Sequence, residues 1–256
     1  MKIAVVTGAS SGLGRELTLQ LARTEKHLDE IWVIARRRDR LEALRPLCPV
    51  PLRVLPLDLT APGAADALEA GLAAAAPEVA VLVNAAGFGR MGDWQAVTRR
   101  DSAAMIQLNC QAAVEVTQIC LPYMGPGGRI LEICSTSAFQ PFPYLNVYAA
   151  TKAFLYHYSL ALGRELRSRR ITVTAVCPYW IRDTEFIPVA RQGESQAVRH
   201  FPLASTARRV AVRALLDSRH GRAVSTPGPV CTVHRAAAKC LPSGALMTLW
   251  ESLRRL

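Results

Sequence analysis

A tyrosine and a lysine four residues apart, Tyr148 and Lys152, are the side chains of this sequence best suited to moving a proton. If the segment after Pro143 is helical, this pair lies on one helix face with Cβ atoms about 5–6 Å apart. A phenol has an unperturbed pKa of about 10, so it needs a nearby ammonium to exchange a proton near neutral pH. Ser135, thirteen positions before Tyr148, can hold a substrate oxygen beside the phenol. The three residues outline a proton-transfer site, although this tyrosine–lysine spacing also occurs on helix surfaces without a function.

The N-terminal segment has the pattern of a nucleotide-binding turn. An apolar run at residues 2–7 is followed by a glycine-rich stretch and then by a helical pattern over residues 15–23. Strand, glycine turn and helix in this order can hold a pyrophosphate, because the backbone comes close and the free N–H groups of the helix attract the anion. The glycines that permit this turn are Gly8, Gly12 and Gly14.

The second predicted strand, residues 31–35, indicates which nucleotide binds. A carboxylate at the end of this strand suits the free ribose of NAD, but here Ala35 is followed by Arg36, which suits a 2′-phosphate. Taken alone, Arg36 is better explained as part of the solvated basic start of a helix over 38–45. With the glycine turn upstream, we expect NADP. Asp58, in a third predicted strand at 52–60, can accept a hydrogen bond from the adenine amino group.

The remaining elements alternate between helix and strand. Helices are predicted at 62–76 and at 101–123, the latter capped by Asp101, and strands at 78–87, 128–135, 171–178 and 222–226. Small residues at 85–87 let the backbone lie against a flat ligand. Ligands bind beyond the carboxyl ends of strands in such sheets, where the glycine turn, Arg36, Asp58, Asn84 and Ser135 all fall. We expect one doubly wound α/β domain over 1–228, with about seven parallel strands and helices on both faces.

Several motifs together resemble the short-chain dehydrogenase/reductase family. They are TGASSGLG at 7–14, NAAG at 84–87, Asn109, Ser135 and YAATK at 148–152, and the resemblance extends over residues 2–228. The tail is most similar to the branch of 17β-hydroxysteroid and 3-ketoacyl-CoA reductases and to related bacterial proteins. The resemblance implies a Rossmann-type fold and hydride exchange between NADP(H) and a carbonyl/alcohol pair.

The resemblance also implies residue roles. Tyr148 is the expected acid/base, Lys152 binds the nicotinamide ribose and lowers the tyrosine pKa, Ser135 holds the substrate oxygen, and Asn109 supports a water that links Lys152 to solvent. The expected cofactor contacts are Gly8, Ser10, Ser11, Gly12, Leu13, Gly14, Arg36, Asp58, Leu59, Asn84, Ala85, Ala86, Gly87, Tyr148, Lys152, Ile181 and Thr184.

The segment after the sixth strand departs from the family pattern. Tyr179 replaces a glycine of many members, and Thr184 lies one residue later than the threonine that contacts the nicotinamide carboxamide. Aromatic residues gather on the surrounding loops, which favours an apolar substrate pocket. Its expected walls are Phe139, Phe142, Tyr144, Tyr179, Trp180 and Phe186. Residues 184–205 are expected to form a lid over the site.

Residues 229–256 are predicted to form two short amphipathic helices, with a break at Pro242 and Gly244. Their apolar residues lie among basic ones, so a membrane surface is one partner to consider. Packing on the domain itself or on a second subunit is the favoured alternative. A homodimer or homotetramer is expected.

Composition limits the function classes. The net charge of +11 comes mainly from arginines that are dispersed over the 256 residues, and no nucleic-acid motif accompanies them, so we expect no nucleic-acid partner. The histidines have no metal-ligand spacing, and no metal is expected. The seven cysteines lack CxxC pairs, which favours reduced, buried thiols. No apolar run is long enough to span a bilayer, and Met1 leads straight into the first predicted strand. These three features predict a cytoplasmic protein.

The function predicted from the sequence is an NADP-dependent oxidoreductase acting on an apolar ketone or alcohol, hydroxysteroid-like or ketoacyl-like. The rival is a non-catalytic NADP-binding sensor or scaffold with the same fold. Such a sensor needs no acid/base, so the set of Asn109, Ser135, Tyr148 and Lys152 argues against it. A sugar-nucleotide epimerase or dehydratase would need a larger substrate domain than this length allows.

Overall fold

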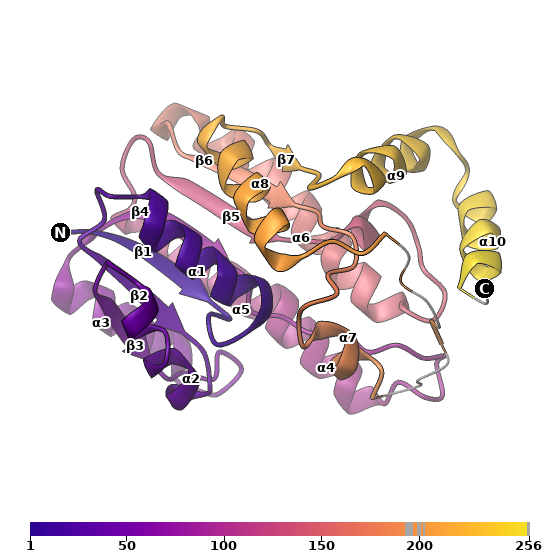
Figure 1. The fold of residues 1–256 in the computed structure, drawn as a ribbon, viewed down its shortest axis with the longest axis horizontal. Helices are drawn as coiled ribbons and strands as arrows, with labels where there is room; N and C mark the ends of the chain where they lie inside the picture. The colour runs from indigo at the N-terminus through magenta and orange to yellow at the C-terminus, as the bar shows by residue number, and fades with distance from the viewer. Residues whose placement is uncertain (193–196, 199–200, 202, 255–256) are drawn as a thin grey trace.

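A computed structural model describes residues 1–192, 197–198, 201 and 203–254 of the chain. Seven parallel strands form one sheet in the order β3-β2-β1-β4-β5-β6-β7 (Figure 1). Most strands carry near-continuous apolar runs because both faces of the sheet are covered. Their bounds are β1 Lys2–Thr7, β2 Glu30–Ile34, β3 Leu52–Leu55, β4 Glu78–Asn84, β5 Arg129–Ile133, β6 Thr172–Val176 and β7 Val224–Ser225. This confirms the expected doubly wound fold.

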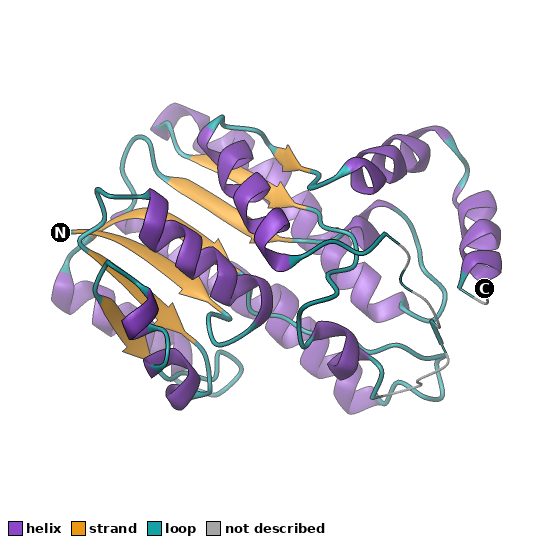
Figure 2. Ribbon diagram, in the orientation of Figure 1, coloured by secondary structure: helices purple, strands orange, loops and turns teal. Residues whose placement is uncertain are grey.

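Helices cover both faces of the sheet (Figure 2). One core packs the sheet against α1 (Gly12–Thr24), α2 (Arg38–Glu42) and α8 (Ala207–Arg219). The other packs it against α3 (Ala64–Ala75), α5 (Ala112–Cys120) and α6 (Asn146–Glu165). Alternate residues of β1 point into opposite cores, Ala4 and Val6 into the first and Ile3 and Val5 into the second. The strand period of two therefore explains how one apolar run fills both layers.

The predicted helix over 101–123 differs in the structure. It begins as α4 (Arg99–Ile106), passes through a π-helical stretch at Gln107–Gln111 and continues as α5. Thr98, not Asp101, is the N-cap, because its side chain accepts a hydrogen bond from the backbone N–H of Asp101. The predicted cap was wrong by three residues. The π-helical stretch contains Asn109, and such insertions occur frequently at functional sites.

Other bounds differ by shorter lengths. β3 ends at Leu55 rather than residue 60, so Asp58 lies beyond the strand. Short 3-10 turns lie at Arg45–Leu47, Leu121–Tyr123, Thr136–Phe139 and Leu166–Arg169. Of the predicted lid at 184–205, α7 (Phe186–Ala190) is described, and residues 193–196, 199–200 and 202 lie outside the described residues. A bridge between Ile181, three residues before this segment, and Ser205, its last residue, holds its two sides together.

The C-terminal extension forms two helices, α9 (Pro229–Cys240) and α10 (Ser243–Leu253), drawn in yellow in Figure 1. They separate at Leu241 and Pro242, whereas Gly244 lies inside α10, contrary to the predicted break at both residues. Within the described part of the chain, every helix is too short or too polar to reach across a bilayer.

Candidate active site

A cleft of about 690 Å³ runs along the carboxyl ends of the strands. One end is lined by the glycine turn, the middle by Ser135, Tyr148 and Lys152, and the far end by aromatic side chains. The sheet topology explains this gathering, because each parallel strand delivers the residues after it to the same edge. All the sequence-predicted cofactor residues line the cleft except Asn84.

The glycine turn is shaped for close approach. Gly8 has φ +67° and Gly12 has φ +54°, in the region that side chains disfavour. A Cβ on Gly14 would lie 2.4 Å from the carbonyl oxygen of Gly8, so only glycine fits there. Ser11 precedes α1 without capping it through its side chain, which leaves the first N–H groups of the helix directed at the cleft. This end of the cleft suits an anion.

Arginines flank the same end. Arg36 is exposed and lies near enough to the carboxylate of Asp58 to lower its pKa, although burial opposes this and hydrogen bonds from Thr60 contribute more. Arg37 was missed by the sequence reasoning: its guanidinium donates to the hydroxyl of Ser11 at 3.0 Å and of Ser10 at 3.4 Å. Two adjacent arginines thus border the cleft beside the glycine turn, and the Arg36–Arg37 repeat was the available signal.

Asn84 is turned away from the cleft. Its amide donates to the Glu132 carboxylate at 2.9 Å and to the Thr117 hydroxyl at 2.8 Å, all in the interior. The expected nucleotide contact is therefore not made by this side chain. Burial raises the pKa of Glu132 to about 7, against the hydrogen bonds from Asn84 and Thr117 and the charge of Lys152. One oxygen each of Asn84 and Glu132 has no partner.

Ser135, Tyr148 and Lys152 come together as the sequence predicts. Ser135 follows β5, while the other two lie one turn apart near the start of α6. The Tyr148 hydroxyl lies close enough to the Ser135 side chain for the two to interact. Lys152 Nζ lies 5.8 Å from the centre of the Tyr148 ring and donates to the Ile133 carbonyl at 2.7 Å.

Burial governs the charges of this group. It raises the pKa of Tyr148, against the interaction with Ser135. It also lowers the pKa of Lys152, because a buried ammonium loses its hydration. The raised pKa keeps the Tyr148 phenol protonated, as a proton donor must be, whereas the lowered pKa of Lys152 brings its neutral form closer in energy to the ammonium. The causes of the Tyr148 shift are burial, Ser135 and Cys134, so the expected lowering of the tyrosine pKa by Lys152 is not seen in the structure.

Asn109 clamps the loop that follows β4. Its Oδ1 accepts from the Phe88 N–H at 3.0 Å, and its Nδ2 donates to the Phe88 carbonyl at 2.9 Å and to the Thr151 hydroxyl at 3.0 Å. Gly87 lies beside it: a Cβ there would be 2.9 Å from Asn109 Oδ1 and 3.4 Å from Lys152 Nζ. The missing side chain keeps open the space between the amide and the ammonium.

The far end of the cleft is aromatic. Tyr148 packs against Phe186 with ring centroids 5.3 Å apart, and Trp180 packs on Phe186 at 6.4 Å. Phe142 and Tyr179 also line this end. Two residues that were predicted to line the pocket, Phe139 and Tyr144, do not line it. Phe139 packs on Tyr156 and His234. The backbone of Tyr144 has φ +66°, and its ring lies under the guanidinium of Arg254.

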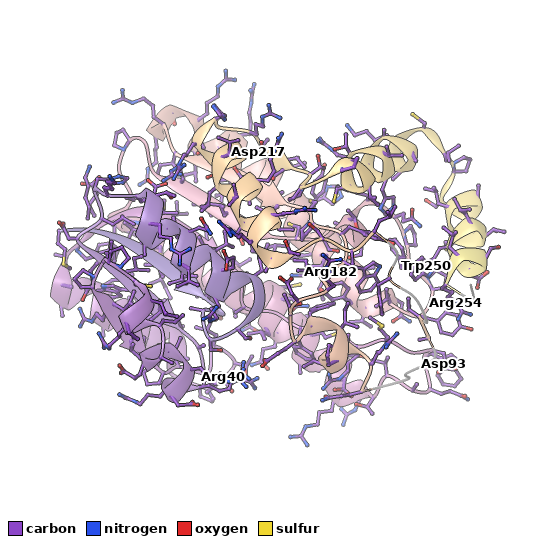
Figure 3. All side chains as sticks on the ribbon, viewed as in Figure 1. Arg40, Asp93, Arg182, Asp217, Trp250 and Arg254 are labelled. Atoms are coloured by element: carbon purple, nitrogen blue, oxygen red, sulfur yellow. The ribbon has the colours of Figure 1, made fainter. Side chains whose placement is uncertain are left out.

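Trp250 of the C-terminal extension lines the cleft as well, which the sequence reasoning missed. Its indole N–H donates to the Pro143 carbonyl at 2.9 Å. Figure 3 shows Trp250 and Arg254 on the side of α10 toward the rest of the domain. Further contacts hold the extension there, including His234 with Gln140 at 2.8 Å. No sequence signal linked residue 250 to the site.

Three arginines lie near the aromatic end in sequence or in space, and their positions differ. Arg182 lines a separate shallow depression with Phe201 and Leu203 and is not part of the cleft. Arg90 and Arg100 line the cleft instead. Arg90 is paired with Asp101 at 3.1 Å and also donates to the Val189 carbonyl. Its charge is thus already neutralised within the protein.

The cleft fits a dinucleotide. The glycine cradle and the uncapped N–H groups of α1 suit a pyrophosphate, and Arg36 and Arg37 suit a phosphorylated ribose. Residues 85–87 offer a side-chain-poor surface between these groups and Lys152. Among the described residues, no three of His, Cys, Asp and Glu gather as in a metal site. Five cysteines are buried, Cys48 is half-buried, Cys240 is exposed, and all seven are free thiols.

Fold and site together define an α/β oxidoreductase with a serine, a tyrosine and a lysine at a nucleotide cleft. The model of the short chain dehydrogenase family matches residues 2–195. The chain belongs to this family.

Two relatives of the chain are named as reductases. The chain is 32% identical over 192 residues to the very-long-chain 3-oxoacyl-CoA reductase of Homo sapiens, covering 70% of this chain and 59% of that protein. It is 33% identical over 198 residues to the sulfoacetaldehyde reductase of Chromohalobacter salexigens, covering 75% and 77%. The chain thus spans well under two thirds of the length of the human relative.

Solved structures show the same architecture over most or all of the chain. A short-chain dehydrogenase from Sphingobium yanoikuyae in complex with NADPH has a TM-score of 0.79 and 28% identity, covering 100% of this chain and 97% of that one. Actinorhodin polyketide ketoreductase with NADPH has a TM-score of 0.74 and 26% identity, covering 88% and 95%.

Proposed function

We propose that this chain is an NADP(H)-dependent oxidoreductase that interconverts a bulky, apolar ketone and its secondary alcohol, with Tyr148 as the acid/base. One observation carries the proposal: the neighbouring side chains of Ser135 and Tyr148 lie with Lys152 in a cleft that joins a phosphate cradle to an aromatic pocket. Hydroxysteroid-like and ketoacyl-like compounds have the required shape and polarity.

In the reduction, a bound nicotinamide supplies the hydride to the carbonyl carbon. The Tyr148 hydroxyl gives its proton to the substrate oxygen, and the Ser135 hydroxyl holds that oxygen in place. Lys152 stabilises the phenolate that is left and orients the ribose. Asn109 and the space at Gly87 keep a water path from Lys152 to solvent, through which the proton is replaced.

NADP is the proposed cofactor because the end of β2 carries Arg36 and Arg37 and no carboxylate. An arginine–phosphate pair is a charge-assisted contact worth about 1.5–3 kcal/mol, or one to two decades in affinity. The structures in complex with NADPH from relatives at 26–28% identity are consistent with this choice.

The substrate is proposed from the lining of the pocket. Phe142, Trp180, Phe186 and Trp250 offer apolar area, and burying such area contributes about 25 cal/mol per Å². Arg182 lies outside the cleft and Arg90 is paired, so balancing the desolvation of a carboxylate would fall to Arg100, whose exposed charge is screened by solvent. The similarity to a 3-oxoacyl-CoA reductase is consistent with an acyl ketone.

Purified protein should be screened with NADPH and NADH against ring ketones, 3-oxoacyl thioesters, acetone, keto acids and sulfoacetaldehyde. We expect NADPH to bind at least about tenfold more tightly than NADH and bulky ketones to have the highest kcat/KM. If the small anions outperform every bulky ketone, the apolar pocket is refuted and exposed Arg100 at the cleft becomes the residue to test. The rival sensor predicts tight NADPH binding without turnover of any compound.

A further inference from the structure

The segment after β6 crosses the nucleotide end of the cleft. It runs from Tyr179 and Ile181, which line the cleft, to Thr184. Thr184 lies against the glycine turn: a Cβ placed on Gly12 would be 3.4 Å from the Thr184 Cβ and 3.6 Å from its methyl carbon. Thr184 also donates to the Ile181 carbonyl at 3.2 Å, which holds the segment in a tight turn. The next residue, Glu185, therefore emerges beside the glycine turn.

Glu185 reaches across the cleft to two arginines. One carboxylate oxygen accepts from Arg37 at 3.0 Å, and the other accepts from Arg40 of α2. Figure 3 marks Arg40 at the α2 side of the molecule. The same Arg37 nitrogen also donates to the hydroxyl of Ser11. One guanidinium thus links the glycine turn, the end of β2 and the segment before α7.

A carboxylate at this position occupies the place of another anion. Arg37 lies on the strand-end turn where the fold presents a cation to the ribose of the nucleotide. A phosphate and a carboxylate both prefer the planar fork of an arginine. They cannot both occupy the same N–H groups, and their charges repel each other when they lie side by side.

We propose that Glu185 competes with the 2′-phosphate of the cofactor for Arg37 and Arg40, and thereby sets how strongly the protein prefers NADP to NAD. When no phosphate is present, the same contact tethers the segment before α7 to α2. Binding of the 2′-phosphate releases this tether. The inference rests on the proposed NADP specificity and adds a residue that opposes it.

The predicted effect is selective and moderate. The side chains of Arg37, Arg40 and Glu185 are each 41–46% exposed, and such ion pairs contribute little individually. Glu185→Gln should therefore tighten binding of a 2′-phosphorylated ligand about three- to tenfold and leave other nucleotides unchanged.

The test uses two fragments that differ only by that phosphate. Dissociation constants of 2′,5′-ADP and 5′-AMP should be measured by calorimetry for the wild type, Glu185→Gln and Glu42→Gln. Glu42 pairs with Arg45, also on the α2 side, and its substitution removes the same charge without touching Arg37 or Arg40. We expect the ratio of the two constants to change in Glu185→Gln and to stay constant in Glu42→Gln.

The outcomes separate the two proposals. If the wild type binds both fragments equally, the NADP specificity fails and this inference fails with it. If the wild type prefers 2′,5′-ADP but Glu185→Gln leaves the ratio unchanged or lowers it, only the role of Glu185 is refuted. Amide hydrogen exchange of α7 in the nucleotide-free protein tests the tether: exchange should be faster in Glu185→Gln, and unchanged exchange would refute it.

Discussion

The indole ring of Trp250 packs edge-on against the ring of Phe142, with the centroids 4.9 Å apart and an interplanar angle of 77°. The two residues are separated by more than a hundred positions in the sequence, and both line the aromatic end of the cleft. The C-terminal extension therefore adds a ring to the apolar cluster that also contains Trp180 and Phe186, and the apolar character of the pocket depends in part on it.

Trp250→Ala should lower kcat/KM for a bulky ketone at least about tenfold while changing that for acetone much less. Removing the indole deletes apolar contact area that only a large substrate uses, at about 25 cal/mol per Å². Steady-state kinetics on both ketones measure the difference. Leu253→Ala is the control, because that side chain is 53% exposed on the same helix. Equal losses for the two ketones would mean that Trp250 only stabilises the fold.

Tyr148→Phe should reduce turnover at least about 100-fold, the usual contribution of a general acid. It removes one hydroxyl and keeps the ring against Phe186, so NADPH affinity should stay close to that of the wild type. Stopped-flow and fluorescence titration separate the two quantities. Tyr156→Phe, on the same helix but outside the cleft, is the matched control. Wild-type turnover in Tyr148→Phe would refute the proposed acid/base.

Gly87→Ala should slow turnover at least about tenfold by filling the space between Asn109 and Lys152. The new methyl group would come within 2.9 Å of Asn109 Oδ1, so water could no longer sit there. Gly125→Ala is the control, since a Cβ at that position meets nothing within 4 Å. If the variant keeps wild-type turnover and its solvent isotope effect, the proton path does not pass this point.

Glu132→Gln should change how stability depends on pH. Burial raises the pKa of Glu132 from 4.5 to about 7, so folding favours the protonated form. The stability that the folded protein gains from binding this proton is fully present below about pH 4.5 and is lost as the pH rises through 7. The loss amounts to about 1–3 kcal/mol of the free energy of unfolding. The glutamine variant does not titrate. The melting temperature of the wild type should therefore fall relative to Glu132→Gln between pH 5 and pH 8.

Exposed Glu69→Gln is the control for this comparison, because the residue lies on the outer side of α3. If the difference between wild type and Glu132→Gln is the same at both pH values, Glu132 does not take up a proton on folding in this range.

The sequence by itself determined the fold class and most of the cleft. Apolar runs alternating with helical patterns required a parallel sheet, and such a sheet brings every residue after a strand to one edge. The glycine turn, Arg36, Asp58, Ser135, Tyr148 and Lys152 could be placed because their positions depend on local pattern and on this rule. Whether two arginines or one face the cleft could not be decided, since that depends on side-chain direction in the turn after β2.

Only the tertiary structure decided which way side chains turn and which distant segments meet. Asn84 lies at a strand end yet points into the core, because Thr117 and Glu132 accept hydrogen bonds from its amide nitrogen there. The Phe139 and Tyr144 rings have the right position in sequence but pack on His234 and Arg254 of the extension. Trp250 and Glu185 join the cleft through contacts more than 100 residues away in the chain. No local pattern encodes such contacts, because they form only when packing brings the segments together.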